Sequence, residues 1–183
     1  AVRFFRELEF RTFLARFEGL RKPPPVGPTH YRPILDLSAL EAAAVECRQV
    51  GRFAFDPEPD RLDARTARLI GLSLSARPGA ACYVPIEHAY SGAPAQIPAE
   101  QARRVLAPLF ADPAVAKVAF HAKFDVHVLA GWGVPVAGLT SDPRIAAYLL
   151  EPAGKMQGLK DLSAAMLGVR METFEEVMRK ARP

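Results

Sequence analysis

Cysteine is scarce in this chain, with only Cys47 and Cys82 among its 183 residues. Two widely separated cysteines form neither a disulfide framework nor a zinc-ligand pattern, so we expect a reducing compartment. No apolar run approaches membrane-spanning length, and no charged segment followed by an apolar segment marks a signal peptide. These absences predict a cytoplasmic protein without a membrane partner.

Two widespread catalytic signatures are also missing. The sequence has no Gly-x-Ser-x-Gly elbow, which a Ser-His-Asp hydrolase of the α/β type would need. It has no P-loop for binding nucleotide phosphates. His88 and His127 lie far apart in the sequence, and we do not expect them to share a metal ion.

The composition is that of a folded protein, because 50% of the residues are hydrophobic and 24% are charged. The length suits one domain of ordinary size with an appendage. The formal net charge of +4 permits an anionic partner such as nucleic acid but does not require one.

Three parts follow one another along the chain. Apolar residues at helical spacing predict an N-terminal helix within residues 1–21, which needs a partner surface to be stable. Residues 22–34 are rich in proline and predict a stiff linker, and residues 35–183 form the main domain. The chain starts without Met and inside a helical pattern, so we expect it to be a piece of a longer protein.

The main domain alternates in its pattern between strands and helices. Strands are predicted over residues 52–56, 69–76, 81–86 and 117–121. Helices are predicted over residues 36–49, 98–110, 122–131, 143–150, 159–167 and 173–181. Strands come first and then alternate with helices, which predicts the α/β class, with a mixed β-sheet flanked by helices.

Asp56 and Glu58 end the first of these strands. Alternate side chains of a strand point to the same face, so both carboxylates lie together if the extended path continues. Neighbouring carboxylates repel one another, and a divalent cation removes that repulsion. Oxygen ligands suit Mg²⁺ or Mn²⁺ rather than zinc. The alternative is an acidic turn, because Asp and Pro both favour turns.

Asp125 lies in the first turn of the helix predicted over residues 122–131, just beyond the end of a strand. Ligands gather at this edge of open α/β sheets. The alternative is an acid that only complements the positive end of the helix dipole. If Asp125 converges with the two acids of the first strand, the three carboxylates would hold two cations.

The order and spacing of these motifs resemble the 3′→5′ exonuclease domain of bacterial DNA polymerase I, in the DEDD superfamily with its ribonuclease-H-like fold. The resemblance rests on Phe-Ala-Phe-Asp-x-Glu-x-Asp-x-Leu at residues 53–62 and on Tyr-Val-Pro-Ile-x-His-x-Tyr at residues 83–90. It continues through the segments 117–129, 142–150 and 173–176. Residues 6–10 are similar to the segment that joins the 5′ nuclease to the rest of the polymerase.

The resemblance implies that Asp56, Glu58 and Asp125 are the catalytic and metal-binding acids, with two Mg²⁺ or Mn²⁺ ions per site. It implies hydrolysis of the 3′-terminal phosphodiester of DNA, release of nucleoside 5′-monophosphates, and proofreading in DNA replication and repair. The expected partners are a single-stranded or frayed 3′ end and the polymerase and 5′ nuclease domains of the parent chain, close to the nucleoid.

Four further residues are expected to contact the 3′ end. Leu62 and Phe174 match the family's apolar pair at the terminal nucleotide, although the pattern alone would make them ordinary core residues. His121 and Phe124 precede Asp125 and are expected beside it. The alternative for His121 is a half-buried histidine with satisfied hydrogen bonds.

The sequence departs from the family pattern in three places. The third motif, a Tyr followed four residues later by an Asp, is absent and is expected beyond Pro183. Pro57 and Pro59 replace usual threonines, as does the proline after Asp142. Phe120 and His121 replace a usual pair that contains Asn. Two alternatives therefore remain: a catalytically weakened spacer between the 5′ nuclease and polymerase domains, and a free-standing exonuclease of the ribonuclease D type that acts on RNA.

Overall fold

The computed structural model describes residues 29–150, 158–173, 176 and 179. The helix predicted within residues 1–21 and most of the helix predicted over residues 173–181 lie outside the described residues. The chain divides into two compact units, Gly27–Lys155 and a second that combines Ala1–Val26 with Met156–Pro183. The first unit carries the sheet, and it starts inside the segment that we expected to be a linker.

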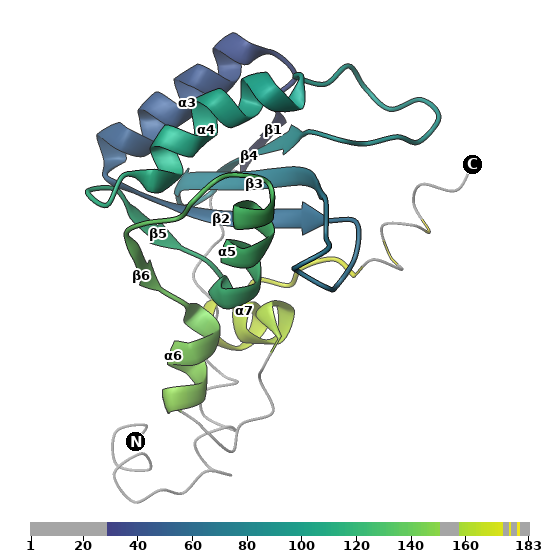
Figure 1. Ribbon diagram of the computed structural model, residues 1–183. Helices are drawn as coiled ribbons and strands as arrows, with labels where there is room; N and C mark the ends of the chain where they lie inside the picture. The colour runs from purple at the N-terminus through teal and green to yellow at the C-terminus, as the bar shows by residue number, and fades with distance from the viewer. Residues whose placement is uncertain (1–28, 151–157, 174–175, 177–178, 180–183) are drawn as a thin grey trace, which may run out of the picture. The chain divides into compact units, whose positions relative to one another are not determined.

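Within the described residues, six strands form one sheet in the order β1-β4-β3-β2-β5-β6 (Figure 1). The strands are β1 (His30–Pro33), β2 (Arg52–Pro59), β3 (Leu69–Arg77), β4 (Ala80–Pro85), β5 (Ala116–Val118) and β6 (Leu139–Ser141). β2, β3 and β4 pair antiparallel, whereas β1 with β4, β2 with β5, and β5 with β6 pair parallel. The predicted α/β class with a mixed sheet is confirmed.

Helices cover both faces of this sheet. They are α3 (Leu37–Val50), α4 (Ala99–Ala111), α5 (Ala122–Gly131) and α6 (Pro143–Leu150), and the second compact unit contains α7 (Leu159–Leu167). α3 and α4 lie on one side of the sheet and α5 on the other (Figure 1). Among the described residues, no helix is long and apolar enough to cross a bilayer.

The bounds of α3 follow from its end residues. The Asp36 side chain accepts a hydrogen bond from the Ala39 N–H at 2.9 Å, which caps the first turn as the sequence predicts. Gly51 ends the helix with a φ of 76°, a left-handed conformation that glycine adopts without a steric penalty. The bounds predicted for α5, α6 and α7 are also those observed.

An aromatic cluster forms the core between β2 and α4. Phe53 and Phe55 point to the same face of β2 and are both buried. The ring of Phe110 meets each of them edge-on, with centroid distances of 5.2 and 5.0 Å. Edge-on pairs of this kind add about 1 kcal/mol each to the stabilisation from buried area. The cluster therefore fixes which face of β2 points to the helices α3 and α4.

The prediction of a linker was wrong for its last residues, because His30–Pro33 forms strand β1. β1 pairs parallel with β4, and its ends are held by hydrogen bonds from His30 N to Gly79 O at 2.7 Å and from Ile34 N to Tyr83 O at 2.8 Å. Proline is tolerated in an edge strand because the N–H that it lacks can face solvent. Proline content alone therefore could not separate a linker from an edge strand.

β2 is longer than predicted and runs through Pro57 to Pro59. Within β2, only residues 52–54 pair with β5, so beyond them this side of β2 has no partner strand among the described residues. The Ile70 carbonyl accepts hydrogen bonds from the β4 side, so by alternation the backbone of Leu72 also faces β4. Pro57 is the cross-strand partner of Leu72, so its nitrogen points away from β3. On that side no neighbouring strand requires a backbone N–H donor, and proline can occupy the position.

Candidate functional site

Asp56 and Glu58 lie on the same face of β2. Burial alternates along the strand, with Phe53, Phe55 and Pro57 buried and the two carboxylate residues exposed. Since the phenylalanines pack against α4, both carboxylates point to the opposite face, where α5 lies (Figure 1). The alternation expected from the sequence is confirmed, and the acidic turn that was its alternative is wrong.

Asp125 reaches this face from the first turn of α5. Its side chain is buried, with only 3% of the residue exposed, and no hydrogen-bond partner satisfies its Oδ2 atom. Burial, followed in order by the negative charges of Asp56, Asp142 and Glu58, raises the pKa of Asp125 to about 8. The fold therefore brings the three predicted acids within electrostatic range of one another.

The same surroundings shift the pKa values of the two carboxylates on β2. Although both residues reach solvent, neighbouring protein atoms displace part of the water around them, and this desolvation raises the pKa of Asp56. The pKa of Glu58 is raised by desolvation and then by the charge of Asp56. Negative charge is thus concentrated at the end of β2 beside α5, where each ionised group disfavours the ionisation of the next.

These residues fit a divalent cation in their chemistry. A buried carboxylate oxygen without a partner, surrounded by further carboxylates, is the environment that a cation neutralises. The part of the chain that the structure describes contains no group of three His, Cys, Asp or Glu side chains that could hold a metal ion. The donor set is therefore of the right type, whereas a complete ligand group is not formed by the described residues.

Asp142 is a functional candidate to which the sequence gave no role. Its carboxylate accepts the backbone N–H of His121 at 3.1 Å, of Ala122 at 2.8 Å and of Arg144 at 2.9 Å. It therefore ties the start of α6 to the start of α5, which carries Asp125. Asp142 followed by Pro143 could have predicted a cap at the start of α6. The same pair gives no indication that Asp142 also contacts the start of α5.

His121 and Phe124 form a stacked pair at the start of α5. Their ring centroids are 5.7 Å apart and the ring planes differ by 7°. His121 has a φ of 71°, which among the described residues makes it the one non-glycine residue with positive φ. Its side chain is exposed, so the half-buried histidine that we considered as an alternative is wrong.

Leu62 lies in the loop that joins β2 to β3, and it is 92% exposed. The alternative of a core residue is therefore wrong for Leu62. Asp60 holds the base of the loop, accepting the Arg68 backbone N–H at 2.9 Å and forming ion pairs with Arg61 and Arg68. These contacts hold the pKa of Asp60 well below its usual range. Phe174 lies outside the described residues.

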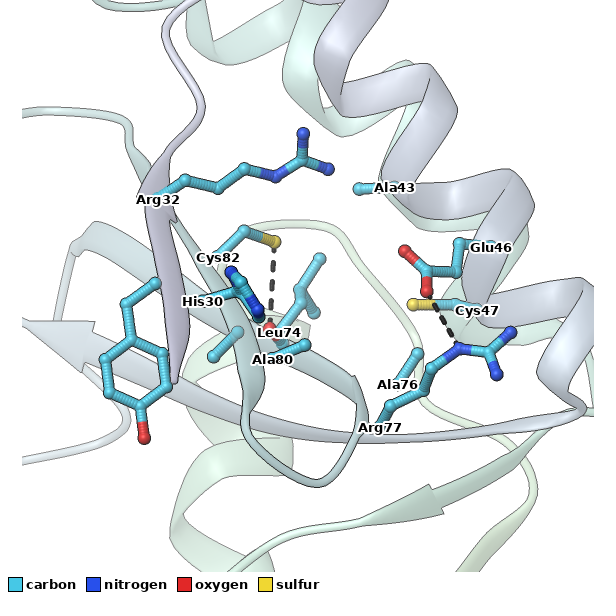
Figure 2. A pocket seen from close by; sticks show the side chains of 12 residues that line it. His30, Arg32, Ala43, Glu46, Cys47, Leu74, Ala76, Arg77, Ala80 and Cys82 are labelled. Carbon is cyan, nitrogen blue, oxygen red and sulfur yellow. Dashed lines mark hydrogen bonds and ion pairs between the residues drawn. The ribbon is translucent and has the colours of Figure 1, made fainter. Parts of the chain in front are cut away.

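A separate hollow of about 500 Å³ lies on the opposite face, between α3 and strands β1, β3 and β4 (Figure 2). Both cysteines line it, together with the ion pair between Arg77 and Glu46. Burial, with a smaller contribution from Cys82, raises the pKa of the Cys47 thiol to about 12, and burial also raises the pKa of Cys82. Protonated thiols are poor nucleophiles and poor metal ligands, so we place the functional site at the carboxylates instead.

Comparison with known proteins identifies relatives of this chain. The family described as 3′-5′ exonuclease matches residues 31–182. DNA polymerase I of Pseudomonas aeruginosa is 31% identical over 190 residues, which cover 98% of this chain and 21% of that protein. DNA polymerase I of Chloroflexus aurantiacus is 39% identical over 154 residues, which cover 83% of this chain and 16% of that protein.

The fold is also similar to that of a solved structure. The POL domain of Pol1 from M. smegmatis, in complex with DNA primer-template and dNTP, superposes with a TM-score of 0.63 at 28% identity. The match covers 82% of this chain and 25% of that one. This chain thus spans about a fifth of the length of the two curated relatives.

Proposed function

The chain belongs to the 3′-5′ exonuclease family of DNA polymerase I, and on that premise we propose that Asp56, Glu58 and Asp125 carry its hydrolytic reaction. The observation that carries this proposal is the buried carboxylate of Asp125, whose Oδ2 lacks a partner while two acids of β2 raise its pKa. Two acids of β2 and a third from α5 lie on the side of the sheet opposite α3 and α4 (Figure 1).

We infer that these acids bind two Mg²⁺ or Mn²⁺ ions, because carboxylate oxygens are the ligands that these ions prefer. Such ions supply a water of lowered pKa and stabilise the leaving oxygen of a phosphodiester. Asp56 and Glu58 would offer their oxygens from the end of β2, and Asp125 would offer its unsatisfied Oδ2 from α5. The charge of the three side chains would also keep the phosphate backbone away from the site unless cations are bound.

The proposed substrate is a single-stranded or frayed 3′ end of DNA. Each hydrolysis step would release one nucleoside 5′-monophosphate from that end. The exposed Leu62 side chain and the stacked rings of His121 and Phe124 offer surfaces on which nucleobases pack without sequence preference. Arg61 and Arg65 flank Leu62 with largely exposed side chains that suit contacts to phosphates. Phe174 is proposed as a further contact on the family resemblance alone.

In the whole protein, we propose that this domain proofreads for a polymerase domain and that a 5′ nuclease domain belongs to the same chain. Both partners are named from the relatives, which are DNA polymerases of about five times this length.

A second candidate function is a structural spacer without activity. The lack of a complete ligand group among the described residues favours it. The two candidates differ in one measurable property, the release of nucleotides that depends on a divalent cation.

The test is release of the labelled terminal nucleotide from a 3′-labelled DNA strand in MgCl₂ or MnCl₂. The exonuclease predicts release that stops in EDTA and in the variant Asp56→Ala. Glu46→Gln is the matched control, because that carboxylate lies on the α3 side and pairs with Arg77. Release by Asp56→Ala at the wild-type rate would refute the assigned role, and no release by the wild type in either metal would support the spacer.

A further inference from the structure

The motif at residues 83–90 contains a hydrogen-bonded pair of side chains, Tyr83 and His88, that has no role in the proposed reaction. The Tyr83 hydroxyl and the Nε2 atom of His88 lie 2.7 Å apart. Gln96 fixes the backbone of His88 from both sides, since its Oε1 accepts the His88 N–H at 2.8 Å and its Nε2 donates to the His88 carbonyl at 2.9 Å. The Tyr90 ring packs against the histidine with a centroid distance of 5.5 Å. The pair is thus held in place before any ligand binds.

Strand register places Tyr83 on the face of the carboxylates. Asp56 is the cross-strand partner of Ser73, and Ser73 is the partner of Tyr83. Directly opposed residues of paired strands point to the same face. The Tyr83 side chain therefore leaves the sheet on the same side as Asp56.

Gly71 shows where the tyrosine hydroxyl lies. Gly71 is the cross-strand partner of Glu58, and a β-carbon built on Gly71 would overlap the Tyr83 hydroxyl. The hydroxyl therefore occupies the space in which a side chain opposite Glu58 would begin. Opposed β-carbons of a strand pair are separated by roughly 5 Å, a distance that a glutamate can close because its carboxylate oxygens lie three bonds beyond the β-carbon.

The electrostatics of Tyr83 agree with this position. Burial raises the pKa of Tyr83, and the charge of Glu58 and then Tyr90 add to the shift. A tyrosine hydroxyl can donate one hydrogen bond while it accepts another. Across the described ranges, no group donates a hydrogen bond to the Glu58 carboxylate, Tyr83 included, so its oxygens are available to the phenol when the glutamate side chain turns towards it.

We propose that Tyr83 is a positioning residue for Glu58, with His88 orienting the phenol. The Nε2–H of His88 donates to the Tyr83 oxygen, which leaves the phenol proton to donate to the Glu58 carboxylate. The glutamate is thereby held in one rotamer, facing the acids Asp56 and Asp125. This inference rests on the proposed function, because it assigns Glu58 to metal binding.

The test measures binding of MnCl₂ alone to the full chain by titration calorimetry. Tyr83→Phe removes the hydroxyl and keeps the ring, and we expect it to weaken Mn²⁺ affinity about tenfold, the usual effect of losing a group that orients a metal ligand. Tyr31→Phe is the matched control, since Tyr31 lies on the neighbouring strand β1 with 70% of its surface exposed. Its affinity should equal that of the wild type.

Variants of His88 separate positioning from a general loss of structure. His88→Gln keeps an N–H donor and should retain most of the affinity, whereas His88→Leu should behave like Tyr83→Phe. In the nuclease assay, Tyr83→Phe should lower kcat and leave KM for the DNA strand unchanged. Equal unfolding temperatures for wild type and Tyr83→Phe exclude a folding defect as the cause.

The outcomes distinguish the two proposals. Wild-type affinity in Tyr83→Phe, with affinity lost in Asp56→Ala, overturns the role of Tyr83 and leaves the proposed function intact. Equal loss in His88→Gln and His88→Leu overturns the role of the histidine donor. If the wild type binds no Mn²⁺, or if Asp56→Ala binds it equally well, the proposed function falls and this inference with it.

Discussion

Asp142 Oδ2 accepts the backbone N–H of Ala122 at 2.8 Å, which joins the first residue of α5 to the residue before α6. The other oxygen of the same carboxylate accepts from His121 and Arg144. One side chain therefore satisfies N–H groups at the starts of two helices. Because α5 carries Asp125 in its first turn, this contact also sets where the buried acid lies.

We expect Asp142→Ala to lower the free energy of unfolding by about 2–3 kcal/mol, because three backbone donors lose their acceptor. Asp142→Asn keeps one acceptor oxygen and should lose about half as much. Urea unfolding followed by circular dichroism measures both. Asp36→Ala removes a cap that serves one N–H of α3, and it should cost less than Asp142→Ala. A larger loss in Asp36→Ala would contradict the bridging role.

The buried acid predicts a pH dependence of stability in the absence of metal. The pKa of Asp125 is raised from its ordinary 3.8 to about 8 in the folded protein, so between these values the folded chain holds a proton that the unfolded chain releases. The stabilisation is fully present below pH 4 and is lost as the pH rises towards 8, with a slope of about −1.4 kcal/mol per pH unit. Asp125→Asn should lack this slope. Urea titrations in EDTA measure it, and parallel slopes for the two proteins would refute the assignment.

Divalent cations should reverse this loss at high pH. At pH 8 a metal bound only by the folded state stabilises it by roughly 1.4 kcal/mol when its concentration is tenfold above Kd. We expect MnCl₂ to raise the unfolding temperature of the wild type and to leave that of Asp125→Asn nearly unchanged. Calorimetry with and without EDTA checks this, and an equal rise in both proteins would indicate binding elsewhere.

Truncation to alanine should lower stability strongly at Phe110 and hardly at all at Leu62. Phe110→Ala removes the centre of the buried aromatic cluster and should cost about 3–5 kcal/mol of stability. Leu62→Ala removes an exposed side chain and should change stability by less than about 0.5 kcal/mol. The same variant should raise KM for the DNA strand, because a proposed contact to the 3′ nucleotide is lost. A stable variant with unchanged KM would remove Leu62 from the site.

Substitutions of His121 test whether the left-handed backbone before α5 is strained. At a φ of 71° a side chain is strained, most of all a β-branched one. We expect His121→Gly to be about 1–2 kcal/mol more stable than His121→Val in urea unfolding. Both variants lose the ring that stacks on Phe124, so both should bind single-stranded DNA more weakly than wild type. Equal stability of the two variants would show that the turn is not strained.

Local patterns predicted most helices, because their caps and periodicity are short-range properties. The bounds of α5, α6 and α7 were predicted without error. β5 was predicted to reach residue 121 but ends at Val118, since the chain turns at His121 into a left-handed conformation. β1 was missed because, in the part of the chain that the structure describes, the one strand that pairs with it is β4, which lies far along the chain.

The sequence by itself determined the α/β class and, through strand alternation, that Asp56 and Glu58 share a face, because both follow from residues that are neighbours in the chain. The tertiary structure alone decided that Asp125 is buried beside them with an unsatisfied oxygen, that Asp142 links two helix starts, and that Tyr83 lies over Gly71. These three relationships depend on strand order and helix packing. Such contacts join residues far apart in the chain, and no local pattern contains them.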